Sequence, residues 1–263
     1  MLNSPKEIAA NYVGIGTGKA KLDKAKMFVL AIMAGMFIAF GGVACTTASV
    51  SIEAASVAKL VGACVFPGGL AMVLLAGSEL FTGNCLLVIP LMEKKITAAE
   101  MVISWIIVWL GNLVGGMLVA AMMVYSHLGN LFGGAEAQAM VNTAVGKVSL
   151  GFGDALIRGI LCNILVCIAV WMSFAVKDAA GKVIAIFFPV MIFVLGGFEH
   201  CVANMYFISA GLFAKSVYAL EAADLTWAAF FVKNLLPVTI GNIIGGAGVG
   251  LVYWFAYLKG QNK

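Results

Sequence analysis

Charged side chains are scarce in this sequence. Asp, Glu, Lys and Arg make up only 11% of the 263 residues, whereas 63% are hydrophobic and the mean hydropathy is +1.06. A soluble domain of this length cannot bury that much apolar surface. The composition therefore excludes a soluble domain and indicates an integral membrane protein. We expect the lipid bilayer to surround it and no nucleic acid among its partners.

Metal-ligand patterns are also missing. The chain has two histidines, and its six cysteines lie in apolar runs without a C-x-x-C pair. Structural metal sites use ligands clustered at short spacings, so we expect no metal and interpret the cysteines as small packing residues. The sequence contains no nucleotide-binding loop, and we expect no cofactor. It also lacks a cleavable signal pattern, because its first apolar run, 27–48, is long enough to span a membrane.

Long apolar runs are what the sequence does have. They predict an all-α membrane protein with six spans, because a span needs about 20 residues. A single helix of more than 30 residues would reach almost 50 Å, so the second and fifth runs are too long for one span each. Both contain proline and glycine, and we predict that both are broken by an irregular loop lining a cavity. The six runs are 27–49, 57–89, 101–125, 156–176, 183–214 and 228–257.

The distribution of lysine and arginine predicts the orientation. Six spans place both termini on one side, and the side richer in basic residues is normally cytoplasmic. That side would hold Lys6, Lys19, Lys21, Lys24, Lys26, Lys94, Lys95, Lys177, Lys182, Lys259 and Lys263. The other side would hold Lys59, Lys147, Arg158, Lys215 and Lys233. The order Ser4, Pro5, Glu7 predicts the start of a helix, which we place on the cytoplasmic surface.

The chain contains an internal repeat. "GSELFTGN" at 77–84 matches "GFEHCVAN" at 197–204, and "GNLVGG" at 111–116 matches "GNIIGG" at 241–246. A Phe-Pro pair precedes each glutamate, and both Gly-x-x-x-Gly patterns permit close helix contacts. Halves of three spans each must run through the membrane in opposite directions, a design of transporters and channels. One channel domain, 1–263, would then comprise the segments 1–26, 27–125, 126–155, 156–257 and 258–263.

These residues resemble the formate/nitrite transporter family. The resemblance rests on "ELFTGN", "FEHCVAN", the paired "GN--GG" helices and "LCNILVCIAVW" at 161–171. It implies an aquaporin-like pentamer with one pore in each protomer, in a bacterial-type cytoplasmic membrane. It also implies passage of small monovalent anions of weak acids, such as formate, nitrite or hydrosulfide.

The resemblance further implies site residues. His200 matches the central pore histidine, and Thr82 matches the threonine of the loop that breaks the second span. Matches to polar pore positions are Lys147, Lys19, Asn163 and Asn204, and matches to the apolar constrictions are Phe66, Leu70 and Phe193. The repeated Glu79 and Glu199 favour a structural role, such as accepting backbone N–H groups freed by the helix breaks, because a charged carboxylate in the path would repel an anion.

The chemistry of such a pore follows from desolvation. An isolated charge in a narrow apolar passage is strongly disfavoured, and burial favours the neutral form of a weak acid. Chloride has no useful neutral form, so an apolar constriction selects by basicity. His200 could donate a proton or only a hydrogen bond, and both alternatives stay open.

Three other functions were considered. A membrane enzyme would need a nucleophile–base pair or a metal cluster, and neither pattern is present, so we predict that the protein is not an enzyme. An aquaporin-like pore for neutral solutes would suit two half-helices, but paired Asn-Pro-Ala boxes are missing. A secondary active anion/proton symporter would also fit an inverted repeat, although few charges lie at membrane depth.

Overall fold

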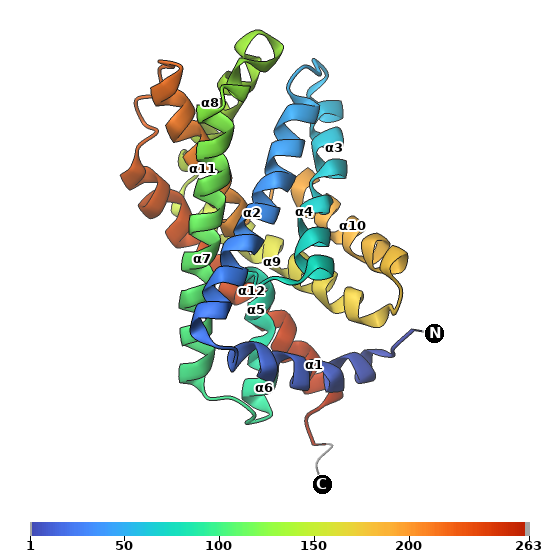
Figure 1. Ribbon diagram of the computed structural model, residues 1–263. Helices are drawn as coiled ribbons and strands as arrows, with labels where there is room; N and C mark the ends of the chain where they lie inside the picture. Colours follow the sequence, from blue (N-terminus) through green and yellow to red (C-terminus); the bar gives the residue numbers. More distant parts are fainter. Residues whose placement is uncertain (1, 261–263) are drawn as a thin grey trace.

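The computed structural model describes residues 2–260, and helices joined by loops make up that part of the chain (Figure 1). Five helical stretches are long and apolar enough to cross a membrane: Lys24–Ser49 (α2), Ala55–Gly77, Ala98–Tyr125 (α7), Phe152–Ala175 (α9) and Ala229–Tyr257. The fold is therefore an all-helical membrane architecture. Lys263, from the predicted tail 258–263, lies outside the described residues.

The second apolar run is divided after Gly77. Helices α3 (Ala55–Val65) and α4 (Pro67–Met72) and the π-helical turn η1 (Val73–Gly77) form one stack. The backbone is then extended at Ser78 before helix resumes in α5 (Phe81–Asn84), η2 (Cys85–Leu87) and α6 (Val88–Met92). Gly77 has φ +84°, a value that favours glycine because it has no Cβ. Pro67 does not break the helical stack, because Phe66 before it keeps helical dihedral angles.

The fifth apolar run is divided in the same way after a glycine. Helix α10 (Ala179–Leu195) ends before Gly197, which has φ +70°, and α11 (Cys201–Val217) begins after His200. Pro189 lies inside α10 and does not end it. The glycine with positive φ lies two residues before the glutamate in both divided runs. The location of each division is thus set by the glycine rather than by the proline.

The N-terminal helix α1 (Pro5–Ala20) lies across one end of the molecule, called here the α1 end (Figure 1). The predicted helix start is confirmed, since Ser4 Oγ accepts a hydrogen bond from Glu7 N and Ser4 N donates one to Glu7 Oε2 over 2.7 Å. Backbone and side-chain bonds from Asn3 to Ala175 and Phe174 tie this end to the last turn of α9. The first segment of the chain is therefore docked on the helical body.

Glycine brings two pairs of helices into close contact. On α7, a Cβ at Gly115 would overlap the carbonyl of Ile32 on α2. On α12 (Leu236–Tyr257), a Cβ at Gly245 would overlap the carbonyl of Ile160 on α9. Gly111 and Gly241 face the same two partners. Each repeated Gly-x-x-x-Gly pattern thus packs the last long helix of its half against the first.

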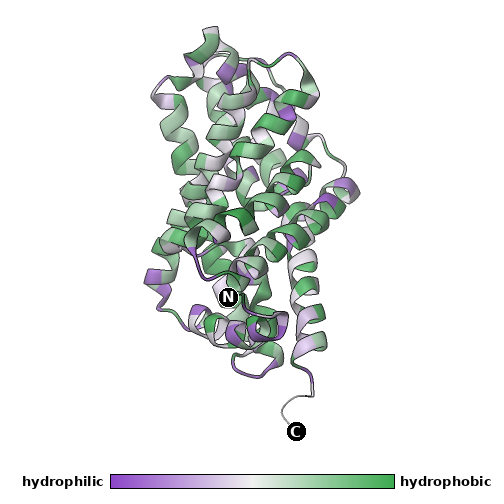
Figure 2. Cartoon of the chain, turned by 90° about the vertical axis from the view of Figure 1, so that its right-hand side faces the viewer, coloured by the Kyte–Doolittle hydropathy of each residue, from purple (hydrophilic) through white to green (hydrophobic). Residues whose placement is uncertain are grey.

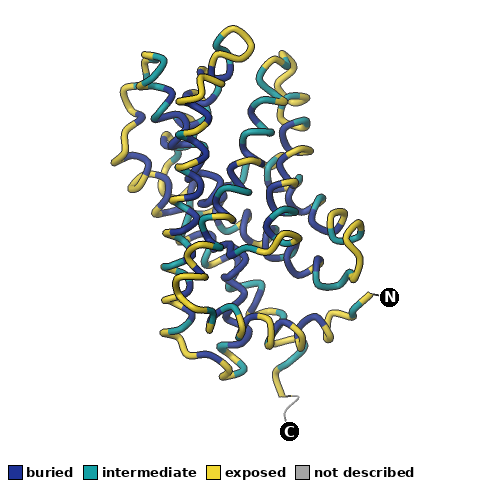
Figure 3. Tube along the Cα trace, in the orientation of Figure 1, coloured by how far each residue is buried: buried dark blue, intermediate teal, exposed yellow. Residues whose placement is uncertain are grey.

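The remaining elements form the opposite end, called here the α8 end. There η3 (Leu128–Gly134) leads into α8 (Ala135–Val148), and the π-helical turn η4 (Ala229–Leu235) precedes α12. Hydrophobic residues dominate the middle of the molecule and hydrophilic ones gather towards the ends (Figure 2). The inner helix faces are buried, and much of the exposed chain lies in the terminal loops (Figure 3).

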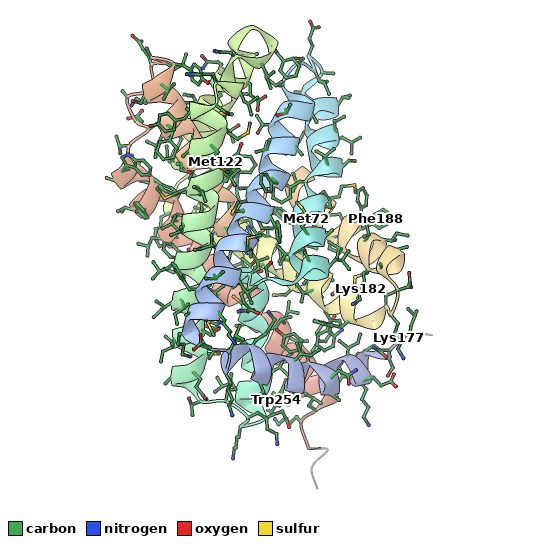
Figure 4. The ribbon with its side chains drawn as sticks, viewed as in Figure 1. Met72, Met122, Lys177, Lys182, Phe188 and Trp254 are labelled. Atoms are coloured by element: carbon green, nitrogen blue, oxygen red, sulfur yellow. The ribbon has the colours of Figure 1, made fainter. Side chains whose placement is uncertain are left out.

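Large apolar side chains remain exposed on the outer faces between the two ends. Figure 4 labels Met122 and Phe188, which are 48% and 55% exposed. Lys177, Lys182 and Trp254 lie nearer to the α1 end in the same view. An apolar belt with tryptophan and lysine at its border is the expected surface of a helix bundle in a bilayer.

Candidate functional site

A partly buried ion pair follows the division after Gly77. Lys19 Nζ on α1 lies 2.8 Å from Glu79 Oε1, and Asn84 Nδ2 donates to Glu79 Oε2 over 2.8 Å. Lys19 Nζ also donates to Asn84 Oδ1 over 3.3 Å. These residues are called here the Glu79 cluster. Lys19 thus reaches the predicted break from a helix that lies outside both halves of the repeat.

A second partly buried ion pair follows the division after Gly197. Lys147 Nζ on α8 lies 3.0 Å from Glu199 Oε1, while Glu199 Oε2 accepts from Asn204 Nδ2 over 2.6 Å and from Asn234 Nδ2 over 3.3 Å. Asn234 also donates to the carbonyl of Lys147 over 2.9 Å. These four residues are called here the Glu199 cluster. It places a lysine–glutamate pair at the second division, as the Glu79 cluster does at the first.

The backbone at each division is held by an asparagine of a GN pair. Asn112 Oδ1 accepts from Phe81 N over 2.9 Å, and its Nδ2 donates to the carbonyls of Ala31 and Glu79. Asn242 does the same for Cys201 N and for the carbonyls of Gly159 and Glu199. Groups released from helical hydrogen bonding are thereby satisfied inside the protein.

This arrangement corrects one detail of the sequence interpretation. The sequence predicts that the carboxylates of Glu79 and Glu199 accept backbone N–H groups, but they accept from lysine and asparagine side chains instead. The asparagines of the GN pairs take the backbone instead. The difference arises because each carboxylate points towards a lysine from outside its own divided run, and a cation is the stronger partner for an ionised group.

His200 and Thr82 join the two divisions. His200 Nε2 lies 3.0 Å from Thr82 Oγ1, and both side chains are buried. His200 Nδ1 accepts a hydrogen bond from Ala203 N over 3.0 Å, so a neutral ring carries its proton on Nε2 and donates to Thr82. The hydroxyl proton of Thr82 is then free to be donated to a third group.

The pocket at the α8 end leads to His200. Its volume is about 360 Å³, and its lining includes Lys147, Glu199, His200 and Asn204 together with Phe66 and Phe193. The rings of Phe66 and Phe193 meet edge to face with centroids 5.8 Å apart, and Phe193 stacks on His200 at the same distance. Phe66 and Phe193 are called here the apolar neck. Both are almost fully buried.

Leu70 lies on the far side of the neck. It lines a pocket of about 30 Å³ together with Lys19, Tyr12, Asn84 and Phe174, a volume that suits little more than one or two water molecules. Among residues 2–260, none lines both this pocket and the one at the α8 end. The turn from Phe66 to Leu70 therefore separates two cavities, each beside one lysine–glutamate pair.

Asn163 is fully buried and contacts the backbone of the first division and of α12. Its Nδ2 donates to the carbonyls of Thr82, over 3.2 Å, and Asn242, over 2.6 Å. Cys167 Sγ also donates to the carbonyl of Thr82. Asn163 thus links the first division to the helix that holds the second, and it orients Thr82 from its backbone side.

Several residues of this site are missing from the set predicted from the sequence. Asn84 and Asn242 belong to the repeated stretches, so the repeat was a usable signal for both. The repeat does not indicate Asn234. Asn234 lies eight residues before Asn242, and the corresponding residue of the first half, eight before Asn112, is Ser104. Ser104 is buried, and its Oγ has no hydrogen-bond partner within residues 2–260. The two halves thus differ at this position.

Glu136 on α8 is a further buried carboxyl group. Its side chain has 0% exposure, and Oε1 accepts from Thr47 Oγ1 over 3.1 Å. Burial raises the pKa of Glu136 above its ordinary value, while the bond from Thr47 opposes that change. Its Oε2 and the hydroxyl of buried Tyr206 have no partner in the described part of the chain. In the sequence, "GGAEAQAM" at 133–140 resembles an exposed turn and helix start.

Comparison with known proteins decides the family. The family model for formate/nitrite transporters matches residues 6–255. The chain belongs to the formate/nitrite transporter family. Members of this family are transporters and channels rather than enzymes.

Individual members of the formate/nitrite transporter family match over most of the chain. An uncharacterized transporter of Bacillus subtilis, YrhG, is 43% identical over 260 residues, covering 97% of this chain and 94% of its own. The formate channel FocA of Haemophilus influenzae is 39% identical, covering 88% and 86%. A solved pentameric formate channel with formate bound superposes with a TM-score of 0.80 at 34% identity, covering 90% and 98%.

Proposed function

We propose that this protein is a passive, proton-linked channel for small monovalent anions of weak acids, with formate as the first candidate. The observation that carries the proposal is the apolar neck beside the His200–Thr82 pair, with a lysine–glutamate pair near the cavity on each side. The match to formate channels supports formate as the cargo. Nitrite and hydrosulfide are also small monovalent anions of weak acids and are proposed as further cargoes.

The neck would favour the neutral form of the cargo. An anion drawn into the pocket at the α8 end loses water as it approaches Phe66 and Phe193, and desolvation raises its affinity for a proton. A formate ion can take up that proton from water and cross as formic acid. A chloride ion cannot do so usefully and would stay behind. The neck therefore selects by basicity and by size together.

His200 and Thr82 would serve the cargo as hydrogen-bonding groups. Because Nδ1 of His200 accepts from Ala203 N, the Nε2 proton is directed at Thr82, whose hydroxyl can donate to an oxygen of the cargo. This assignment keeps the histidine neutral during passage. Asn163 and Asn204 support the arrangement from the Thr82 carbonyl and the Glu199 carboxylate. Leu70 would form a second constriction towards the α1 end.

The proposed architecture is a six-span inverted repeat with broken second and fifth spans. In support, both divided runs have a glycine of positive φ two residues before a buried glutamate. The proposed domain is 1–263, with repeats at 27–125 and 156–257 joined by 126–155. Both termini would be cytoplasmic in an inner membrane, with α1 on the cytoplasmic surface, and five protomers would each hold one pore.

Flux measurements on purified protein in liposomes test the proposal. We expect formate, nitrite and hydrosulfide to enter well above the rate of protein-free liposomes, whereas chloride and nitrate remain near that rate. Uptake of glycerol without anion uptake would instead favour a pore for neutral solutes. Accumulation of formate against its own gradient, driven by a proton gradient beyond the distribution expected for a weak acid, would favour an active symporter.

A further inference from the structure

The pocket at the α8 end contains a second lysine, which no step above uses. Lys59 on α3 lines this pocket together with Lys147 and Glu199. Lys147 is held at 3.0 Å by Glu199, so the charges of that pair largely cancel for an approaching anion. Lys59 is exposed and has no hydrogen bond or ion pair within residues 2–260. The uncompensated positive charge of the pocket therefore belongs to Lys59.

The position of Lys59 on α3 follows from helical spacing. Lys59, Gly62 and Phe66 lie three and four residues apart, so they share one helix face, and all three line the pocket. Gly62 packs tightly on α2, since a Cβ there would lie 2.8 Å from Cys45 Sγ. Lys59 precedes Phe66 by seven residues, which is about 10 Å along a helix. The lysine thus stands roughly two turns outside the apolar neck.

The ammonium group of Lys59 reaches across the pocket to the second division. A Cβ built on Gly197 would lie 3.2 Å from Lys59 Nζ, so the lysine uses the space that this glycine leaves. Gly197 lies two residues before Glu199 and three before His200. Lys59 therefore spans from α3 to the loop that carries Glu199 and His200. An anion going to Lys147 from outside passes this ammonium group.

We propose that Lys59 is the outer anion-binding residue of the pore, a site that takes a monovalent carboxylate or nitrite-sized anion before it meets Lys147. This inference rests on the proposed function. An exposed ammonium binds such an anion weakly and releases it quickly, which suits a conducting pore. Lys147 acts next, because its ammonium lies 5.4 Å from the centroid of Phe207, whose ring stacks on Phe66. The two lysines form a graded path from solution to the neck.

Charge variants at Lys59 test this order. In liposomes at low ionic strength, Lys59→Gln should raise the half-saturating formate concentration about threefold to tenfold, with the maximal rate unchanged because the neck still limits passage. Lys59→Glu should raise it further, and Lys59→Arg should behave as the original protein. The differences should fade in about 1 M potassium gluconate, where the screening length is about 3 Å.

Lys233→Gln is the matched control. Lys233 is also an exposed lysine near the α8 end, on η4, but it does not line the pocket. Its replacement should leave formate uptake unchanged. Equal half-saturation for Lys59→Gln, Lys59→Glu and Lys233→Gln would overturn the role of Lys59 while formate flux itself persists. Absence of formate flux in the original protein would instead reject the proposed function.

Discussion

Asn242→Ala is expected to lower the melting temperature of the detergent-solubilised protein by on the order of 10 °C or to prevent its isolation in folded form. The side chain is fully buried and serves three backbone groups, namely Cys201 N and the carbonyls of Gly159 and Glu199. Each buried polar group left without a partner costs about 1–3 kcal/mol. The sum is a large part of the stability of a typical domain.

Asn112→Ala and Gln138→Ala are the matched comparisons for Asn242→Ala. Asn112 serves the corresponding backbone groups at the first division, so its loss should be of similar size. Gln138 makes one exposed hydrogen bond, to Asn142, and its replacement should change the melting temperature little. Fluorescence-detected size-exclusion chromatography after heating measures all three variants. If the melting temperature of Asn242→Ala equals that of Gln138→Ala, groups other than the asparagines of the GN pairs hold the backbone at the divisions.

Lys147→Met is expected to destabilise the protein and to reduce formate uptake strongly. Glu199 is only 5% exposed, and removing its cation leaves a buried charge, an effect of about 3–5 kcal/mol in other proteins. Adding Glu199→Gln removes that charge. The double variant should therefore regain much of the lost thermal stability but not the uptake, because the ammonium group near the neck is still missing.

The double-mutant comparison separates folding from conduction. Melting temperatures and uptake rates of Lys147→Met, Glu199→Gln and the double variant form one cycle, which isolates the energy of the pair. Additive losses of stability in the double variant would show that the two side chains do not depend on each other. Full uptake by the folded double variant would remove Lys147 from the anion path.

The internal repeat allowed much of this site to be predicted. Glu79 and Glu199 were chosen because they recur at one spacing, and each is found in a partly buried ion pair. Lys147 and Lys19 came from the family resemblance, and their partners lie 52 and 60 residues away along the chain. No local pattern reveals such a distant partner. The sequence alone does not indicate which basic residue stays without an ion-pair partner. From the sequence, Lys59 contributes only to the distribution of basic residues that predicts the orientation in the membrane.

The other differences between the sequence predictions and the structure have local physical causes. Pro67 and Pro189 suggested helix breaks, but a proline in the first turn needs no N–H donor, and a helix inside a packed body tolerates one lost bond. Positive φ at Gly77 and Gly197 ends the helices instead. Asn234 was missed because Ser104 occupies the matching position of the other half. The proposed roles of Phe66 and Phe193 depend on the geometry of their rings, and that of Leu70 depends on its place beside a separate cavity. Sequence spacing encodes neither.

In the proposed function, the cargo crosses the apolar neck as a neutral acid. The most direct measurement records formate uptake and lumenal pH together in liposomes whose membrane potential is set by a potassium gradient and valinomycin, with protein-free liposomes subtracted. Passage as a neutral acid should deliver one proton with each formate, at a rate that does not respond to the potential. Uptake that follows the potential and leaves the lumenal pH unchanged would contradict it.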